Sequence, residues 1–240
     1  MSCILHIETS TDVCSVALSQ DGTCLYEQTC NEGPSHAAVL AGFIDETLSF
    51  ADSHAIPLDA VAVSKGPGSY TGLRIGVSAA KGVAYGRDVR LLAVDSLKII
   101  TVPTLLHNPD LPDEALLVPM IDARRMEVYC AVYNRALHEV APIQAVVVEE
   151  DTFLPWLSKG PVYFMGNGAA KCQSVICHPN AHFITDAQPL ARNMIPLAEM
   201  AMARGEFADV AYFEPFYLKE FVAIKSKPKG LETGSLKRNL

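Results

Sequence analysis

The stretch VAVSKGPGSYTGLRIGVSAAKGVAYG, residues 61–86, decides how the chain is organised. Its first three residues form a short apolar run of β type, which the turn Gly66-Pro67-Gly68 ends. A helix is predicted to follow as far as Tyr85, because Ser69 or Thr71 can act as the N-cap and no proline interrupts the segment. The stretch therefore predicts a strand, a glycine-rich loop and a helix in succession.

One face of this predicted helix carries almost no side-chain bulk. Small residues recur at helical spacing, at Gly72, Gly76, Ala79 and Ala80, so another backbone can approach closely. Three uses of the region compete. The loop can hold a phosphate at the helix N-terminus, the bare face can dock a partner helix, or glycine can simply let the helix lie tightly on its own sheet. The loop has neither the GK[ST] of a Walker A motif nor the GxGxxG of the Rossmann fingerprint.

The composition is that of an ordinary globular protein, with half of the 240 residues apolar and 19% charged. The formal net charge of −8 argues against tight binding of nucleic acid by the chain alone, because like charges repel. The seven cysteines include no CxxC pair, which favours a reducing compartment. No apolar run is long enough to span a membrane, and the N-terminus does not resemble a signal peptide, so we expect a cytoplasmic protein.

The order of the predicted elements repeats once along the chain. Apolar runs, turns and helical periodicity predict β-β-β-α-β-α-β-α in the first half, at residues 3–8, 13–19, 23–30, 36–53, 61–63, 71–85, 91–94 and 96–106. The same order follows more weakly at 115–121, 126–133, 143–148, 151–157, 162–165, 168–177, 182–185 and 189–204. This duplication predicts an α/β protein of two ribonuclease-H-like lobes, the layout of the actin, hexokinase and Hsp70 superfamily. The predicted lobes are residues 1–106 and 107–225, with 213–222 packing back on a core and 226–240 forming a disordered tail.

Two loops in the first half are candidates for contacting a nucleotide phosphate. In that superfamily the phosphates meet the first strand-turn-strand of each lobe, which here places Thr9 and Ser10 at the first loop. The second candidate loop contains Gly66, Gly68 and Ser69. The alternative for the first loop is a hydrogen-bonded turn without a ligand. Three acidic residues could face the same cleft or serve only in turns: Glu8, Asp12 and Asp122.

Several motifs occur in the order typical of one known family. The segments ILHIETSTDVCSVAL, KGPGSYTGLRIG, IDARRMEVY, GNGA, NMIPLA and EPFYLK make residues 3–225 similar to the bacterial TsaB (YeaZ) family, although Lys219 stands where that family usually has arginine. That family is the non-catalytic paralogue of TsaD, the enzyme that puts a threonylcarbamoyl group on the tRNA adenosine beside the anticodon. TsaD carries a metal-binding HxxxH helix past its glycine loop. Here Ser96 and Ile100 occupy the two histidine positions.

The resemblance implies a scaffold subunit that binds and activates TsaD, with the ATPase TsaE joining the pair. We expect a homodimer when the chain is isolated, and contact with tRNA only through the complex. The helix 36–53 supports an interface, because its apolar arc is wider than one sheet requires. The implied contact residues lie on this helix and on the helix 71–85, at Val39, Leu40, Phe43, Ile44, Thr71, Gly72, Leu73, Ile75, Gly76, Val77 and Ala80.

We expect no catalytic residue, no metal ligand and no cofactor. Neither Ser96 nor Ile100 can replace imidazole as a ligand of a transition metal. His178 and His182 are spaced as a helical pair, but the proline between them disfavours a helix. The alternative is an autonomous glycoprotease-type peptidase, or a weak ATPase that binds ATP or ADP at the two loops. The missing histidine pair counts against the peptidase, and the lack of an evident carboxylate pair for Mg²⁺ counts against the ATPase.

Overall fold

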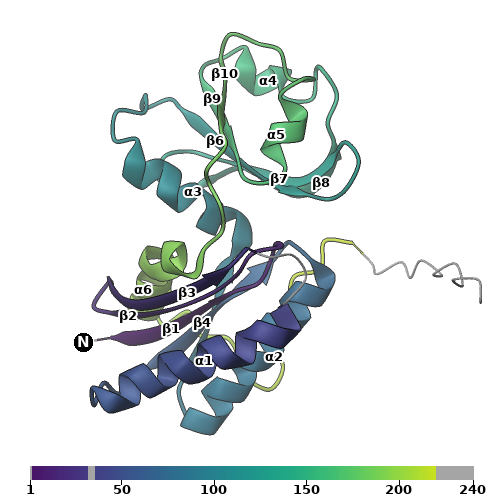
Figure 1. Cartoon of the computed structure of the whole chain (residues 1–240). Helices are drawn as coiled ribbons and strands as arrows, with labels where there is room; N and C mark the ends of the chain where they lie inside the picture. Colours follow the sequence, from purple (N-terminus) through teal and green to yellow (C-terminus); the bar gives the residue numbers. More distant parts are fainter. Residues whose placement is uncertain (1, 32–35, 220–240) are drawn as a thin grey trace, which may run out of the picture.

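A computed structural model of the chain describes residues 2–31 and 36–219, and these residues form two α/β lobes (Figure 1). The first lobe is built on a five-stranded sheet with the strand order β3-β2-β1-β4-β5. Its strands are β1 (Cys3–Glu8), β2 (Cys14–Gln20), β3 (Thr23–Cys30), β4 (Ala60–Gly66) and β5 (Arg90–Asp95). The first three strands are antiparallel neighbours, whereas β1, β4 and β5 run parallel.

The second lobe repeats this sheet in both order and direction. Its strands are β6 (Leu116–Asp122), β7 (Glu127–Tyr133), β8 (Glu139–Val147), β9 (Val162–Met165) and β10 (Ala181–Ile184), in the order β10-β9-β6-β7-β8. Strands β6, β7 and β8 pair antiparallel, and β6, β9 and β10 pair parallel. The two sheets therefore have the same connectivity, which confirms the predicted fold of two ribonuclease-H-like lobes.

The helices differ in length between the two lobes. They are α1 (His36–Ser53), α2 (Tyr70–Arg87), α3 (Ser96–His107), α4 (Leu154–Leu157), α5 (Ala169–Cys172), the 3₁₀ turn η1 (Ala191–Met194) and α6 (Ile195–Arg204). The sequence predicted α4 and α5 as longer helices, but each is a single turn. After Gln173 the chain continues through serine, valine and isoleucine, which are weaker helix formers than alanine or glutamine. Pro196 fits only the first turn of a helix, so α6 begins at Ile195.

Helices cover both faces of the first sheet. Because side chains alternate across a strand, Leu5, Ile7 and Val63 face α1 and α2, which lie side by side in Figure 1. On the other face Ile4 and its neighbours pack against Met194 of η1 and against α6. Ser69 is the N-cap of α2, and its side chain accepts a hydrogen bond from the N–H of Gly72. Of the two predicted N-cap residues, Ser69 and Thr71, the first is therefore confirmed.

Helix α3 lies between the lobes and contacts both. Ile99 belongs to the core of the first lobe, whereas Leu97 and Ile100 pack with residues of the second sheet. The Thr104 hydroxyl donates to the sulfur of Met165 in β9 at 3.3 Å. The carboxylate of Asp95 caps the helix by accepting the N–H of Leu97 at 2.8 Å. The lobes are thus joined by a buried helix.

The chain returns to the first lobe after the second sheet is complete. Helix α6 packs on β5, and the N–H of Ala208 donates to the carbonyl of Leu91 at 2.8 Å. Further on, the N–H of Phe216 donates to the carbonyl of Lys65 at 2.7 Å. Between Ala191 and Phe216 the chain therefore contacts the first sheet, although the predicted lobe 107–225 contains these residues. The predicted tail 226–240 lies outside the described residues. In the described ranges no helix is long and apolar enough to cross a membrane.

Candidate functional site

The two loops that the sequence singled out for a phosphate contact each other directly. The N–H of Ser69 donates to the carbonyl of Ser10 at 2.7 Å, and Thr9 and Ser10 are fully buried. A Cβ on Gly68 would lie 2.3 Å from the carbonyl oxygen of Ser10, so glycine is needed for this approach. A Cβ on Gly66 would lie 2.6 Å from the carbonyl oxygen of Phe216. The fold brings the five predicted residues together, but protein atoms occupy the space between the loops.

A buried carboxyl group lies beneath these loops. Glu8 ends β1 with its side chain fully buried, and its Oε1 accepts the N–H of Ser10 at 2.6 Å. Burial raises the pKa of Glu8 to about 7, and hydrogen bonds from the backbone N–H groups of Ser10 and Thr9 only partly oppose this rise. Among the described residues Oε2 of Glu8 and the hydroxyls of Thr9 and Ser10 have no hydrogen-bond partner. The polar groups of Glu8, Thr9 and Ser10 are thus buried together and are not accessible from solvent.

Ser96 and Ile100, at which the resemblance to TsaD places the two histidines, serve the fold in this chain. The Ser96 hydroxyl is buried and accepts the N–H of Gly66 at 3.1 Å, so it fixes the glycine-rich loop. Ile100 is fully buried between the lobes, 3.3 Å from where a Cβ on Gly166 would lie. In the described ranges no group of three or more histidine, cysteine, aspartate or glutamate side chains could hold a metal ion.

The corresponding turn of the second lobe is exposed and basic. Between β6 and β7, Arg124 and Arg125 adopt positive φ angles of 74° and 51° and point into solvent. The carboxylate of Asp122 accepts the N–H of Arg124 at 2.7 Å and pairs with the Lys171 ammonium at 2.6 Å. In the sequence this segment is part of the motif IDARRMEVY, and within it only Asp122 was named as a residue that could face the cleft or serve in a turn. The run of two arginines after Asp122 was the available signal.

The predicted contact residues on α1 and α2 fall into two groups. Seven of them are buried inside the first lobe: Leu40, Ile44, Gly72, Leu73, Gly76, Val77 and Ala80. Only Thr71 is exposed, and Val39, Phe43 and Ile75 are half-buried. A Cβ on Gly72 would lie 2.1 Å from the carbonyl oxygen of Thr9, and one on Gly76 would lie 2.1 Å from its hydroxyl. The bare face of α2 therefore packs on its own lobe, and the buried seven offer no contact surface.

The opposite sides of α1 and α2 form a second surface of small residues, which we call the outer helix face. Its small residues are the exposed Ala37, Ala38, Ala41, Gly42, Thr71, Ser78, Gly82 and Gly86, and the exposed Asp45, Glu46, Arg74 and Tyr85 border them on the same helices. A Cβ on Gly42, Gly82 or Gly86 would meet no atom within 4 Å. Within the described residues, no neighbouring atom requires glycine rather than a larger residue at these three positions. Helical periodicity places these small residues on a common side of each helix. The sequence alone could not show whether this side or the side with Gly72 and Gly76 faces the sheet.

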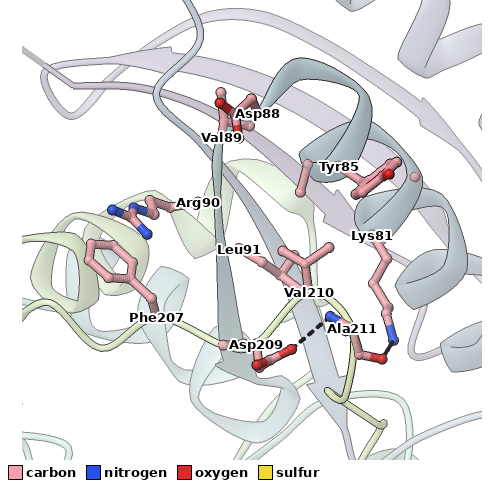
Figure 2. Close-up of a pocket in the computed structure, with 13 residues that line it drawn as sticks. Lys81, Tyr85, Asp88, Val89, Arg90, Leu91, Phe207, Asp209, Val210 and Ala211 are labelled. Atoms are coloured by element: carbon pink, nitrogen blue, oxygen red, sulfur yellow. Dashed lines mark hydrogen bonds between the residues drawn. The ribbon is translucent and has the colours of Figure 1, made fainter.

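A hollow of about 850 Å³ lies at the far end of α2, beside β5 and residues 207–211 (Figure 2). The Lys81 ammonium, on its wall, donates to the carbonyls of Ala211 and Phe213 at 3.0 and 3.1 Å. The Arg90 guanidinium stacks on the ring of Phe207, 5.3 Å from its centre. These cations fasten the returning segment to the first lobe, which indicates a structural role for the hollow.

The duplicated sheets, each with the same strand order, define a two-lobed protein of the actin, hexokinase and Hsp70 superfamily. A family model described as "TsaD: tRNA N6-adenosine threonylcarbamoyltransferase" matches residues 32–225. A solved structure, YeaZ from Pseudomonas aeruginosa, is similar to the chain with a TM-score of 0.75 and 28% identity, and covers 91% of this chain and 100% of that one.

Two bacterial relatives are named tRNA threonylcarbamoyladenosine biosynthesis protein TsaB. The one from Escherichia coli is 28% identical over 236 residues, which cover 94% of this chain and 98% of the relative. The one from Bacillus subtilis is 33% identical over 176 residues, which cover 72% and 74%. The chain belongs to the TsaB (YeaZ) family, and the resemblance inferred from its motifs is confirmed.

Proposed function

We propose that this chain is the non-catalytic scaffold subunit that binds and activates TsaD in threonylcarbamoylation of tRNA, in the cytoplasm. The names of its relatives support the pathway. Two features support a role without catalysis. Ser96 and Ile100 stand where the catalytic paralogue has its metal ligands, and the phosphate loops of the first lobe are packed against each other.

The observation that carries the proposal is that the glycines of the outer helix face have open space around them. Glycine in a helix interior is less favourable than alanine by about 1 kcal/mol, and a contact that a side chain would obstruct gives a physical reason for glycine there. Gly42 and Gly82 have open space around them within the described chain. A helix of a partner could therefore approach the backbones of α1 and α2 closely, as small residues permit.

The half-buried residues border this contact. Val39, Phe43 and Ile75 already pack on the core of the first lobe and leave part of their surface accessible. Apolar residues beside the small residues of the outer helix face suit a second helix pair, which would give a bundle of four helices. In the absence of TsaD, a second copy of this chain would cover the same surface and produce the expected homodimer.

The test is to add bulk and charge to the outer helix face. Ala41→Arg and Ser78→Arg change exposed helical residues, so the chain should fold normally. Both variants should lose co-elution with TsaD from the same organism, whereas Ala203→Arg, an equally exposed position on α6, should retain it. Retention of TsaD by both outer-face variants, with unchanged circular dichroism, would remove the interface from the account.

In this proposal the ATPase TsaE joins the pair formed by this chain and TsaD, and we assign it no contact residues on this chain. A tRNA modification reaction reconstituted from TsaD and TsaE should depend on this chain and should fail with Ala41→Arg. Equal product formation in reactions with and without the chain would contradict the scaffold role.

A further inference from the structure

The turn between β6 and β7 holds two arginines in a backbone conformation that arginine rarely adopts. Arg124 and Arg125 have φ angles of 74° and 51°, in the left-handed region that favours glycine and asparagine. Hydrogen bonds maintain the turn, since the N–H of Ala123 donates to the carbonyl of Glu127 at 3.0 Å and the N–H of Glu127 donates to that of Arg124 at 3.1 Å. Both arginine side chains are exposed as a result.

The carboxylates nearest these arginines in the sequence are already engaged by lysines. Asp122 pairs with Lys171, whose ammonium also donates to the carbonyl of Glu127 at 2.6 Å. The Glu127 carboxylate pairs with Lys219, which comes from the segment that returns across the first lobe. Among the described residues the Arg124 and Arg125 guanidinium groups have no ion pair or side-chain hydrogen bond. Arg124 and Arg125 are therefore the two cations of this turn that no carboxylate of the described chain engages, and the acidic run 149–151 begins beside the turn, after Val148, whose N–H donates to the carbonyl of Met126 at 2.8 Å.

Two adjacent exposed arginines without a carboxylate partner in the described ranges stand out in a chain with 27 acidic and 19 basic residues. The equivalent turn of the first lobe, at Thr9 and Ser10, is buried and carries no basic residue. Only the second-lobe turn of this pair is therefore open to a ligand. Its ligand must carry negative charge, because two adjacent guanidinium groups repel each other and attract anions.

We propose that Arg124 and Arg125 contact the phosphate backbone of RNA when the chain is in its complex. This inference rests on the proposed function, in which tRNA is the polyanion that the complex must hold. Arginine suits the role because its planar fork gives two parallel hydrogen bonds to phosphate oxygens. Contacts of this kind orient an RNA without reading its sequence. The acidic surface elsewhere would keep the chain from binding RNA unselectively.

The test variant is Arg124→Asn with Arg125→Gly, because both new residues tolerate positive φ and the turn should keep its shape. The matched control is Lys159→Gln with Arg204→Gln, which changes the net charge equally at exposed positions outside the turn. The preformed complex of each variant with TsaD is titrated into fluorescently labelled tRNA, and anisotropy is followed over a series of KCl concentrations.

The turn variant should bind tRNA about tenfold more weakly at low salt than the wild-type complex. The slope of log K against log salt should become shallower by about 2, since each lost phosphate contact contributes somewhat less than 1. The control variant should keep the wild-type slope. Both variants should co-elute with TsaD, and the thermal midpoint of the turn variant should not fall, because backbone strain is relieved.

An unchanged affinity and slope for the turn variant would overturn the inference while leaving the scaffold role intact. Loss of co-elution with TsaD in the turn variant would also overturn it, because the arginines would then contact protein. Calorimetry with ATP distinguishes the remaining source of phosphate. The isolated wild-type chain should give no saturable heat with ATP; if it does bind ATP and the turn variant does not, while the affinity for tRNA is unchanged, the RNA assignment is wrong. If even the wild-type chain fails to co-elute with TsaD, the proposed function fails first.

Discussion

Replacement of Gly42 by alanine should stabilise the isolated chain and weaken its contact with a partner. Gly42 lies in the middle of α1 on the outer helix face, and a Cβ there meets no atom within 4 Å. Alanine is more favourable than glycine in a helix interior by about 1 kcal/mol. For a chain of this size, that free energy corresponds to a rise in Tm of about 2–4 °C.

Gly72→Ala is the matched substitution on the inward side. Its Cβ would lie 2.1 Å from the carbonyl oxygen of Thr9, and a backbone atom cannot rotate away. Overpacking of a core costs about 1–3 kcal/mol, which offsets or exceeds the gain in helix propensity. The difference between this cost and the gain of about 1 kcal/mol predicts a fall of up to about 2 kcal/mol in the free energy of unfolding, in contrast to the rise expected for Gly42→Ala.

The assay is thermal unfolding of each variant at a concentration where the chain is monomeric, followed by titration with TsaD. Gly42→Ala should melt at a higher temperature than the wild type and bind TsaD about tenfold more weakly, because a methyl group must fit between closely packed helices. A lower Tm for Gly42→Ala would show that this glycine has a role within the chain. Higher stability with undiminished TsaD affinity would refute the close helix contact.

Three further outcomes follow from the buried carboxylate, the closed loops and the surface charges. Burial raises the pKa of Glu8 from 4.5 to about 7, so the folded state favours the protonated carboxyl group, and this stabilisation is lost as pH rises from 4.5 through 7. Glu8→Gln should therefore raise the free energy of unfolding by about 3 kcal/mol at pH 8 and have little effect near pH 4. Urea titrations at the two pH values measure this difference. Calorimetry of the isolated chain with ATP or ADP should give no saturable heat, because protein atoms occupy the space between the two candidate phosphate loops. Saturable binding of one nucleotide per chain would contradict this closed conformation. Arg87→Ala should lower stability by less than about 1 kcal/mol despite the 2.8 Å ion pair with Asp52, because both side chains are exposed; a larger loss in urea unfolding would show that this pair clamps α1 to α2.

Much of the fold could be predicted because local signals agree with the tertiary structure. The strands Cys3–Glu8 and Val162–Met165 have the predicted boundaries, since polar or glycine-rich turns end each apolar run. The sequence could not predict that α6 crosses to the first sheet. Its apolar residues would fit either lobe, and the choice depends on the path of the chain after β10.

The site was only partly predictable for a related reason. Gly72 and Gly76 were correctly singled out as a face for close approach, but the neighbour is Thr9 of the same chain rather than a partner. That contact joins residues more than sixty positions apart, which periodicity alone cannot reveal. Gly42 and Gly82 look the same in the sequence, and only the structure shows that their surroundings are open.

The central claim, that the outer helix face of α1 and α2 binds TsaD, is tested most directly by site-specific photo-crosslinking in the assembled complex. A photoreactive residue at Ala41 should crosslink to TsaD with high yield, and the same residue at Ala203 of α6 should not. Crosslinks from Ala203 together with none from Ala41 would contradict the account.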